Sequence, residues 1–292
     1  MSPSINYAVV TPVRNEAKHI QFTIDSMNSQ TIKATHWIIV NDGSSDETGR
    51  IVEKAAQAHR WIRVVNRPDR GFRKAGGGVV DAFYEGYRLI EQEPWDYVVK
   101  LDGDLSFAPD YFEKCFDHFN QNNRLGIAGG TICNNVSGVV EVEAKADPQF
   151  HVRGATKIYR RACWLEIGGL IHAPGWDTMD EVKANMLGWT TRTIDGLNVI
   201  HHRLTGAASG AWKDRVKNGT GCYITGYHPL FMLLKCLKRM GEKPYLIGGC
   251  GLVFGFVKGY INRIPQVEDK VLIKYFRQQQ INRLLGRKSL WE

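Results

Sequence analysis

The sequence of 292 residues predicts an α/β fold with a mostly parallel sheet and helices on both of its faces. Through the first 135 residues, short apolar runs of strand length alternate with amphipathic segments of helix length. Several of the apolar runs are continuous, which is typical of strands that are buried on both faces. Polar residues collect directly after these runs, where a parallel sheet places its ligand-binding edge.

Five strands and four helices are predicted in this first part. The strands cover residues 7–11, 37–40, 62–65, 97–101 and 125–132. The helices cover residues 17–29, a segment around 51–55, residues 78–90 and a segment that begins at residue 109. Ser45 or Asp46 precedes the second helix and is a suitable N-cap residue.

The pattern is less regular after residue 136. Strands are predicted at 156–161, 190–194 and 198–202, and a short helix is predicted at 180–187. Beyond residue 210 the sequence predicts further helices, at 229–240, around the apolar stretch 244–257, and at 270–288.

The charge of the chain is divided unevenly. Residues 211–292 hold 15 Lys or Arg and 5 Asp or Glu, whereas residues 1–210 hold 23 and 25, so the net charges are +10 and −2. A slightly acidic body with a basic segment argues against a nucleic-acid binder and favours a segment that faces an anionic partner. The 43% of hydrophobic residues indicate an ordinary globular protein.

Compartment and topology are constrained by what the sequence does not contain. The six scattered cysteines include no CxxC pair, which favours a reducing compartment over a disulfide framework or a zinc ribbon. The first residues do not resemble a signal peptide. The apolar, uncharged stretch 244–257 has 14 residues, whereas a membrane-spanning helix needs about 18–20.

Two glycine-rich stretches do not complete a nucleotide-binding motif. Residues 71–78 lack the Lys-Ser/Thr of a P-loop. Residues 248–251 lack the third glycine of a dinucleotide fingerprint and lie far from the first strand. ATPases and dehydrogenases therefore lose their main support.

Acidic residues at two strand ends are candidates for ligand binding. Asp102 and Asp104 follow a buried strand and can share Mg²⁺ or Mn²⁺ with substrate phosphates, although a solvated acidic turn is the plainer interpretation. Asp42 can accept a hydrogen bond from a base or a sugar hydroxyl, or it can form an Asx-turn with Gly43.

Three motifs occur in order along the first part of the chain: VVTPVRNEAKHI, IIVNDGSSDETGRIVE and VVKLDGDLSFAPDYFEK. They resemble the signatures of the family 2 glycosyltransferases, which have the GT-A fold. The resemblance covers about the first 130 residues. It implies an inverting transfer from a nucleotide-sugar donor with Mn²⁺ or Mg²⁺ as cofactor. The nucleotide-sugar contacts that it implies fall on Thr11, Pro12, Arg14, Glu16, Asp42, Asp102 and, for the diphosphate, Arg70 or Lys74. The metal site that it implies falls on Asp102 and Asp104.

The family also carries a later acidic pair, one member of which is the general base. The best match is Asp180-Glu181, in inverted order, so either residue is a candidate base. The alternative is that these acidic residues complement the dipole of a helix N-terminus. His202, in His201-His202-Arg203, is a candidate metal ligand, while Arg203 could neutralise diphosphate; the alternative is a structural strand end.

With the resemblance, we divide the chain into a GT-A catalytic domain, 1–210, and a C-terminal helical region, 211–292. The domain comprises a nucleotide-sugar-binding half, 1–132, and an acceptor-binding half, 133–210. The basic amphipathic helices of the C-terminal region predict membrane association, with Lys and Arg facing anionic headgroups. The alternatives are that residues 230–237 pack on the catalytic domain and that 244–257 form a buried core helix.

The expected protein is a peripheral, monotopic enzyme on the cytoplasmic face of the membrane. Its acceptor would be a lipid-linked or glycan molecule, and nucleic acid would not be a partner. One alternative is a nucleotidyltransferase that makes nucleotide sugars, but the PVRNE loop lacks the expected glycines. Another is a non-catalytic, membrane-bound carbohydrate-binding protein, against which the two acidic pairs argue.

Overall fold

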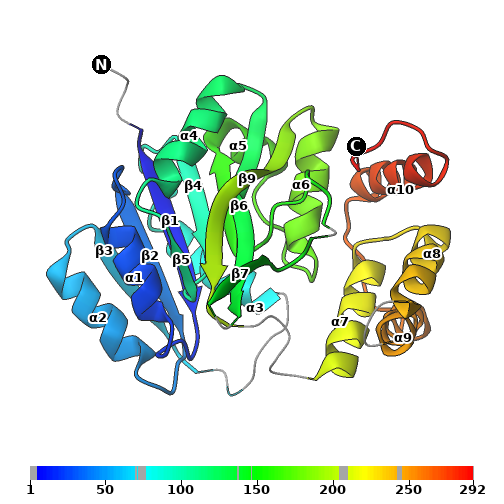
Figure 1. Cartoon of the computed structure of the whole chain (residues 1–292), viewed down its shortest axis with the longest axis horizontal. Coiled ribbons are helices and arrows are strands. Elements are labelled where there is room, and N and C mark those ends of the chain that lie inside the picture. Colours follow the sequence, from blue (N-terminus) through cyan, green and yellow to red (C-terminus); the bar gives the residue numbers. More distant parts are fainter. Residues whose placement is uncertain are drawn as a thin grey trace.

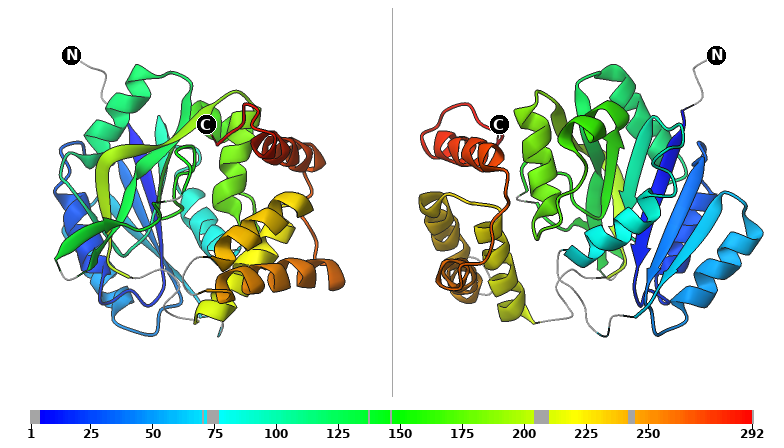
Figure 2. Two further views of the ribbon diagram at one scale, coloured as in Figure 1. Left: turned by 45° about the vertical axis from the view of Figure 1, so that its right-hand side comes forward. Right: turned by 180° about the vertical axis from the view of Figure 1, so that it is seen from behind.

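The computed structural model describes residues 5–69, 71, 77–136, 138–145, 147–203, 210–241 and 245–291. Within these ranges the chain forms one nine-stranded sheet covered by helices on both faces, in the order β3-β2-β1-β4-β8-β6-β9-β5 with β7 beside β6. Four further helices, α7 to α10, gather on one side of this body (Figure 1, Figure 2).

The first half of the sheet is parallel, as the sequence predicts. It consists of β1 (Tyr7–Val13), β2 (His36–Asp42), β3 (Ile62–Arg67) and β4 (Tyr97–Leu101). The carboxyl ends of these strands therefore meet at one edge, where the polar clusters of the sequence lie.

The second half of the sheet is mixed, which differs from the expected mostly parallel arrangement. Strand β8 (Thr156–Arg160) lies antiparallel between β4 and β6 (Leu125–Val136). Strand β9 (Thr190–His201) runs parallel to β6, and both β5 (Leu105–Phe107) and β7 (Val139–Val142) pair antiparallel to their neighbours. The two strands predicted at 190–202 are thus one strand, because Gly196 at φ 81° permits a local irregularity without ending the pairing.

The alternating side chains of the central strands build a core on each face of the sheet. Tyr7 and Val9 face α1 (Ile20–Asn28), α2 (Thr48–Ala58) and α4 (Tyr111–Gln121). Ala8 and Val10 face the other way, toward α3 (Gly77–Tyr87), α5 (Arg161–Ile167) and α6 (Trp176–Met186). A strand that is apolar on both faces requires these two helical layers.

The C-terminal helices are α7 (Ala211–Ile224), α8 (Pro229–Met240), α9 (Ile247–Ile261) and α10 (Lys270–Leu284). Helix α9 presents Gly251, Gly255 and Gly259 to α7, so the two backbones approach closely. Residues 247–257 of the predicted apolar stretch therefore lie in a packed helix. Tyr245 and Leu246 precede this helix, and residue 244 lies outside the described ranges. In the part of the chain that the structure describes, no helix is both long and apolar enough to cross a membrane.

Helix α10 joins the C-terminal helices to the sheet and its covering helices through α6. Leu272 and Phe276 of α10 are buried against Met179 and Val182 of α6. Figures 1 and 2 show α6 lying between the sheet and this helical group. The helix that carries the predicted acidic pair therefore has a fixed partner on each side.

We expect Gly255→Ala to destabilise the protein. A Cβ atom at this position would overlap the carbonyl oxygen of Val216 and lie 2.9 Å from the amide nitrogen of Thr220. Such overpacking lowers the free energy of unfolding by about 1–3 kcal/mol, which urea denaturation measures.

The matched control is Gly221→Ala in α7, where the new Cβ would meet Pro174 at an ordinary 3.8 Å. Because alanine favours helix over glycine, this change should leave stability equal or raise it. Equal stability of the Gly255→Ala variant and the unmodified chain would contradict the close packing of α7 and α9.

Candidate active site

The loops that follow β1 and β2 are joined by hydrogen bonds. The amide of Asn15 donates to the Ser44 hydroxyl over 3.0 Å, and the amide of Ser45 donates to Asn15 Oδ1 over 2.8 Å. The amide of Glu16 donates to the Thr48 hydroxyl over 2.7 Å. Asn15 adopts φ 55°, a left-handed conformation that asparagine tolerates. The two loops therefore form one rim at the carboxyl edge of the sheet.

Arg14 and Asp42 belong to a cluster of charges on this rim. Arg14 donates to the backbone carbonyl of Asp42 over 2.9 Å and to the Asp69 carboxylate over 2.6 Å. Asp42 pairs in turn with Arg67 over 2.6 Å. Since Gly43 has φ 70° and no side chain, the backbone of Asp69 can approach the turn. The cluster is suited to a polar ligand such as a nucleoside.

The other predicted nucleotide residues occupy different environments. Thr11 is fully buried, and its hydroxyl accepts a hydrogen bond from Trp37 Nε1 over 2.9 Å, so its side chain faces the core instead of the rim. Pro12 is half-buried at the end of β1. Arg70 and Lys74 lie outside the described residues.

Asp102 and Asp104 stand on either side of Gly103, between β4 and β5. A Cβ at Gly103 would come within 2.6 Å of Val13, so glycine lets this turn pack against the end of β1. Asp102 pairs with Lys100. Asp104 is buried, and one of its oxygens lies 3.3 Å from His201 Nε2 and 3.2 Å from Arg203 Nε. Its other oxygen, Oδ1, has no hydrogen-bond partner among the described residues.

His201, and not His202, faces Asp104. His201 Nδ1 also lies 3.1 Å from Glu143, so the imidazole stands between two carboxylates. His202 instead bonds to the Ser106 hydroxyl over 2.8 Å and stacks on Phe22 with 4.1 Å between the ring centroids. Successive side chains at a strand end point to opposite sides, which is why one histidine reaches the acidic turn and the other does not.

The environment of His201 favours the charged imidazole. Burial lowers its pKa, whereas hydrogen bonds with Asp104 and Glu143 raise it, and the net result is a pKa of about 10. Arg203 is a second cation beside Asp104, and it also pairs with Glu16. Glu16, to which the resemblance gave a nucleotide contact, is therefore held by Arg203, and its buried Oε2 has no partner among the described residues.

The donor atoms around Asp104 suit a hard divalent cation that is shared with a substrate. Unpartnered carboxylate oxygens on Asp104 and Glu16 are available as ligands. Within the described ranges, no three His, Cys, Asp or Glu side chains are arranged to hold a metal by themselves. Mg²⁺ typically takes one or two carboxylates and completes its shell with water and phosphate oxygens. The residues present fit an ion of that kind.

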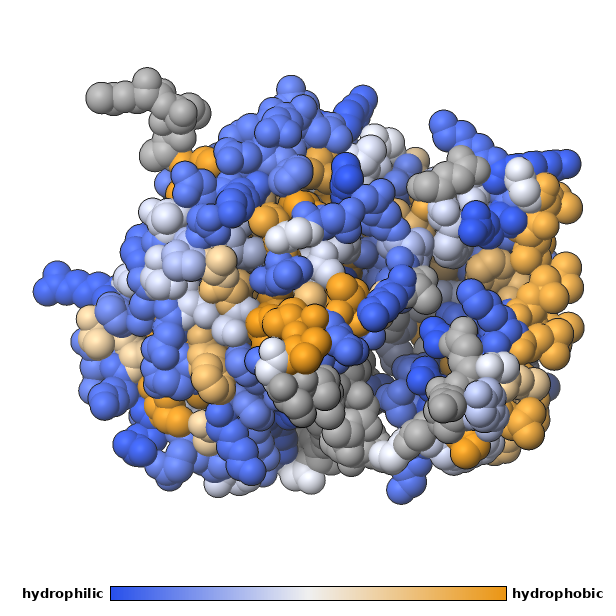
Figure 3. Space-filling view, viewed as in Figure 1, coloured by the Kyte–Doolittle hydropathy of each residue, from blue (hydrophilic) through white to orange (hydrophobic). Residues whose placement is uncertain are grey.

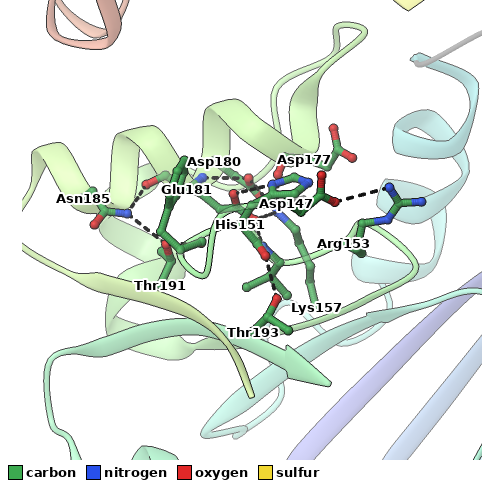
Figure 4. A network of polar contacts seen from close by, with 12 residues as sticks. Asp147, His151, Arg153, Lys157, Asp177, Asp180, Glu181, Asn185, Thr191 and Thr193 are labelled. Atoms are coloured by element: carbon green, nitrogen blue, oxygen red, sulfur yellow. Dashed lines mark hydrogen bonds and ion pairs between the residues drawn. The ribbon is translucent and has the colours of Figure 1, made fainter. Parts of the chain in front are cut away.

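Asp180 lies in a buried network around Lys157 (Figure 4). Its carboxylate accepts hydrogen bonds from Lys157 Nζ over 2.9 and 3.0 Å and from the Tyr159 hydroxyl over 2.6 Å. Burial raises the pKa of Asp180 to about 6, although the Lys157 ammonium opposes this shift. Burial also disfavours the charged form of Lys157, but Asp180 and Glu181 hold the pKa of this lysine above its ordinary value.

Glu181 is equally enclosed. It lies 2.6 Å from Lys157 Nζ and 2.9 Å from His151 Nδ1, and it accepts the amide of Val152 over 2.7 Å. The exposed fractions of Asp180 and Glu181 are 2% and 0%. A general base must reach the hydroxyl that it deprotonates. The structure therefore does not support the interpretation of either residue as the base, and it gives them a structural role.

Asp177 is the accessible carboxylate of the same helix. It lies in the first turn of α6, one turn before Glu181, and it is half-buried. Its backbone carbonyl accepts a hydrogen bond from Lys157. Its carboxylate has no hydrogen bond or ion pair with any described residue, and Figure 4 shows Asp177 at the margin of the network.

Lys100 connects Asp177 with the Asp102–Asp104 turn. Its ammonium pairs with Asp102 and donates to the carbonyl of Gly154 over 2.5 Å. Gly154 runs beside Asp177, because a Cβ at that glycine would lie 3.2 Å from Asp177 Oδ2. The structure thus brings one free acidic side chain of α6 and the acidic turn to the same edge of the sheet.

Four residues were not assigned to the site from the sequence: Asp177, His201, Lys100 and Lys157. One signal was available for the acidic pair: Asp180 lies four residues after Trp176 and four before Ala184, so it shares the apolar face of α6. The two lysines gave no such signal. They lie within apolar strands, and only the pairing of β4 with β8 shows that they lie side by side.

The chain is similar in sequence to a known family of enzymes. The family described as "Glycosyl transferase family 2" matches residues 8–173. The chain belongs to this family. The expectation from the three motifs is therefore confirmed, and the nucleotidyltransferase and non-catalytic alternatives gain no support from the match.

Relatives of the family include polysaccharide synthases. The chain is 30% identical over 118 residues to "Chondroitin synthase" of Pasteurella multocida (strain Pm70), which covers 40% of this chain and 11% of that protein. It is 29% identical over 245 residues to "Poly-beta-1,6-N-acetyl-D-glucosamine synthase" of Staphylococcus aureus (strain COL), covering 76% of this chain and 55% of that protein. The chain thus spans about half or less of these relatives.

Two solved structures share the fold. The mannosyltransferase PcManGT from Pyrobaculum calidifontis, in complex with GDP-Man and Mn²⁺, has a TM-score of 0.56 at 14% identity, covering 97% of this chain and 88% of that one. TarS 1–349 of S. aureus in complex with UDP-GlcNAc has a TM-score of 0.52 at 12% identity, covering 97% and 93%. They support the GT-A-like fold of this family member.

We expect the stability of the protein to fall as the pH rises above about 6.5, in part through His151. Burial lowers the pKa of His151, but Glu181 raises it further, and the net direction is upward. A group whose pKa is raised by folding stabilises the folded state fully below its unfolded pKa and loses this contribution through the folded pKa.

His151→Gln should remove that part of the pH dependence while keeping a polar side chain beside Glu181. Urea denaturation at several pH values on the alkaline side measures the slope for both proteins. The same slope in both would show that His151 does not share a proton with Glu181.

Proposed function

We propose that the protein is an inverting glycosyltransferase with a nucleotide-sugar donor, a hydroxyl acceptor and Mn²⁺ or Mg²⁺ as cofactor. The observation that carries the proposal is the pairing of two acidic centres at one sheet edge. One is the Asp104 turn with its unpartnered oxygen, and the other is Asp177 with its accessible carboxylate. Such a reaction needs these two centres, one for the leaving group and one for the attacking hydroxyl.

The donor would lie along the rim formed by the loops after β1 and β2. Arg14 and Asp42, with Arg67 and Asp69, offer alternating charges to the nucleoside. Asp102 and Asp104 would hold the cation. His201, charged between Asp104 and Glu143, would hold Asp104 in place instead of binding the metal, and His202, which bonds to Ser106, is not assigned as a ligand. A bound divalent cation supplies neutralisation of the charge that develops on the leaving diphosphate.

Arg203 is placed to add positive charge on the same side. Its guanidinium already bridges Asp104 and Glu16, and a planar guanidinium binds phosphate oxygens well. In this proposal Arg203 exchanges part of its carboxylate contacts for the diphosphate. Glu16 then positions the arginine and does not contact the nucleotide.

Asp177 would act as the general base. Its carboxylate accepts the proton of an acceptor hydroxyl while that oxygen forms a bond to the anomeric carbon. The bond from this carbon to the diphosphate oxygen breaks at the same time, so the configuration inverts. Lys157 fixes the position of Asp177 through a hydrogen bond to its backbone carbonyl.

The relatives suggest the substrate class. Chondroitin and poly-N-acetylglucosamine synthases make polysaccharides, as their names state, and the two structural neighbours hold UDP-GlcNAc and GDP-Man. We propose transfer of a hexose or N-acetylhexosamine from a UDP or GDP donor to a polysaccharide or lipid-linked precursor. We also propose that the enzyme is peripheral on the cytoplasmic face of the membrane, which the basic C-terminal region supports.

Asp177→Asn should abolish most transfer without unfolding the protein. The amide cannot accept the proton, and loss of a general base typically lowers the rate by about 10²–10⁴-fold. Incubation with a panel of nucleotide sugars and an oligosaccharide acceptor, with release of nucleotide as readout, measures the effect. Donor binding should stay unchanged.

Two variants serve as controls for Asp177→Asn. Asp147→Asn removes a solvent-exposed carboxylate of the same neighbourhood and should retain activity. Asp180→Asn should lower stability, because it disturbs the buried Lys157 network. Full activity of the Asp177→Asn variant would overturn the assignment of the base.

Asp104→Asn should weaken the dependence of nucleotide binding on the metal. UDP and GDP are titrated calorimetrically into the protein with Mn²⁺ and with a chelator. The unmodified protein should bind one of them more tightly with Mn²⁺, and the variant should lose most of that gain. Asp195→Asn, an exposed carboxylate on β9, is the control. An equal gain in the Asp104 variant would place the metal elsewhere.

A further inference from the structure

Helix α9 buries its glycines together with Leu252 and Phe256, and it leaves other large apolar residues on its outer side. Gly251, Gly255 and Gly259 contact α7, and the glycines at 248 and 249 contact α8. On the outside, Phe254 is 55% exposed and Ile261 is 75% exposed. Val257 and Tyr260 are exposed on the same helix. Close packing through small residues, with large apolar side chains left on the outside, is common among helices in lipid.

Helix α8 continues the apolar surface. Its outward side chains form a leucine face, which consists of Leu230, Leu233, Leu234 and Leu237. The opposite side of the helix buries Met232 and Cys236 against the helical group. Figure 3 shows apolar atoms gathered along the edge of the molecule that α8 forms. Contiguous exposed apolar surface of this kind marks an interaction site.

A basic cavity lies where the leucine face begins. It has a volume of about 540 Å³ and is formed between His228, which precedes α8, and one side of α10. Lys270, Lys274 and Arg277 line it together with Gln278, and no carboxylate does so among the described residues. Arg277 is fixed by its hydrogen bond to the carbonyl of Gly226 over 2.7 Å. The cavity is suited to a phosphate group.

We propose that the outer faces of α8 and α9 dock on an anionic lipid bilayer and that the cavity beside α10 binds the phosphate of a lipid headgroup. The inference rests on the membrane attachment proposed above and assigns it to specific side chains. Two independent features favour lipid over a protein partner. The outward apolar packing matches a hydrocarbon boundary, and the cationic cavity next to it complements the charge of the headgroups.

The geometry also explains why these helices need not span the membrane. Apolar side chains of an interfacial helix enter only the boundary between headgroups and acyl chains. Exposed aromatic residues, Trp212 and Tyr260 among them, suit that boundary because they combine an apolar ring with a polar group. The attachment of α10 to α6 would then hold the active site at a fixed height above the lipid surface.

Sedimentation of the full chain with vesicles tests the proposal. One vesicle consists of phosphatidylcholine alone, and the other of equal parts phosphatidylcholine and phosphatidylglycerol. The protein should bind the second more tightly. Lys270→Gln with Lys274→Gln should weaken binding to the anionic vesicles by about tenfold or more, since each cation near the surface contributes on the order of 1 kcal/mol. Leu233→Gln with Leu237→Gln should weaken binding to both vesicles.

Matched variants control for charge and for apolar content. Lys54→Gln with Arg60→Gln removes two exposed cations around α2, at the far side of the catalytic body. Leu89→Gln with Leu165→Gln removes two exposed leucines from that body. Both control proteins should bind vesicles like the unmodified chain. The changed positions in all four double variants are exposed. The thermal unfolding temperature should therefore be the same in every variant.

Three results would overturn the inference: no binding of the unmodified chain to anionic vesicles, unchanged binding of the cavity or leucine variants, or equal losses in the controls. Titration of UDP and GDP with Mn²⁺ in vesicle-free buffer separates this inference from the proposed catalysis. Nucleotide binding without vesicle binding would contradict only the proposed docking surface. Vesicle binding without nucleotide binding would contradict only the proposed transferase reaction.

Discussion

A lysine that is shielded from water organises the acidic residues of this protein. Lys157 has no exposed side-chain surface, and it meets Asp180, Glu181 and the carbonyl of Asp177. A buried ammonium needs such partners, because removal of one side of a buried ion pair costs about 3–5 kcal/mol. The demand for charge balance therefore draws the first two turns of α6 onto β8. Two carboxylates of α6 are used in these ion pairs, and the third, that of Asp177, stays partly exposed.

The same region relates the two acidic centres to each other. Lys100 of β4 lies opposite Lys157 of β8 in the sheet, and the two ammonium groups lie 5.5 and 5.6 Å from the ring of Trp176. One lysine faces the acidic turn through Asp102, and the other faces α6. Because both come from paired strands, the pairing of β4 with β8 sets how the acidic turn lies relative to α6.

The sequence predicts the parallel half of the fold well, because apolar runs between amphipathic helices allow few other arrangements. The insertion of β8 between β4 and β6 has no such local signal, since it depends on pairing across 55–63 residues with β4 and 30–32 residues with β6. The site shows the same division. The acidic turn is evident from its position after a strand. His202 and the pair Asp180-Glu181 were assigned by motif order, but the direction of a side chain is set by strand alternation and helix burial.

The stereochemistry of the product is the most direct test of the proposed mechanism. In the proposed mechanism, Asp177 acts as the base on the side opposite the leaving diphosphate, which gives one displacement and no covalent intermediate. With an α-linked nucleotide sugar that the protein accepts as donor, the anomeric proton of the product can be followed by NMR from the first turnovers. Single displacement predicts a β-linked product from the start of the reaction. An α-linked product would contradict single displacement and with it the role assigned to Asp177.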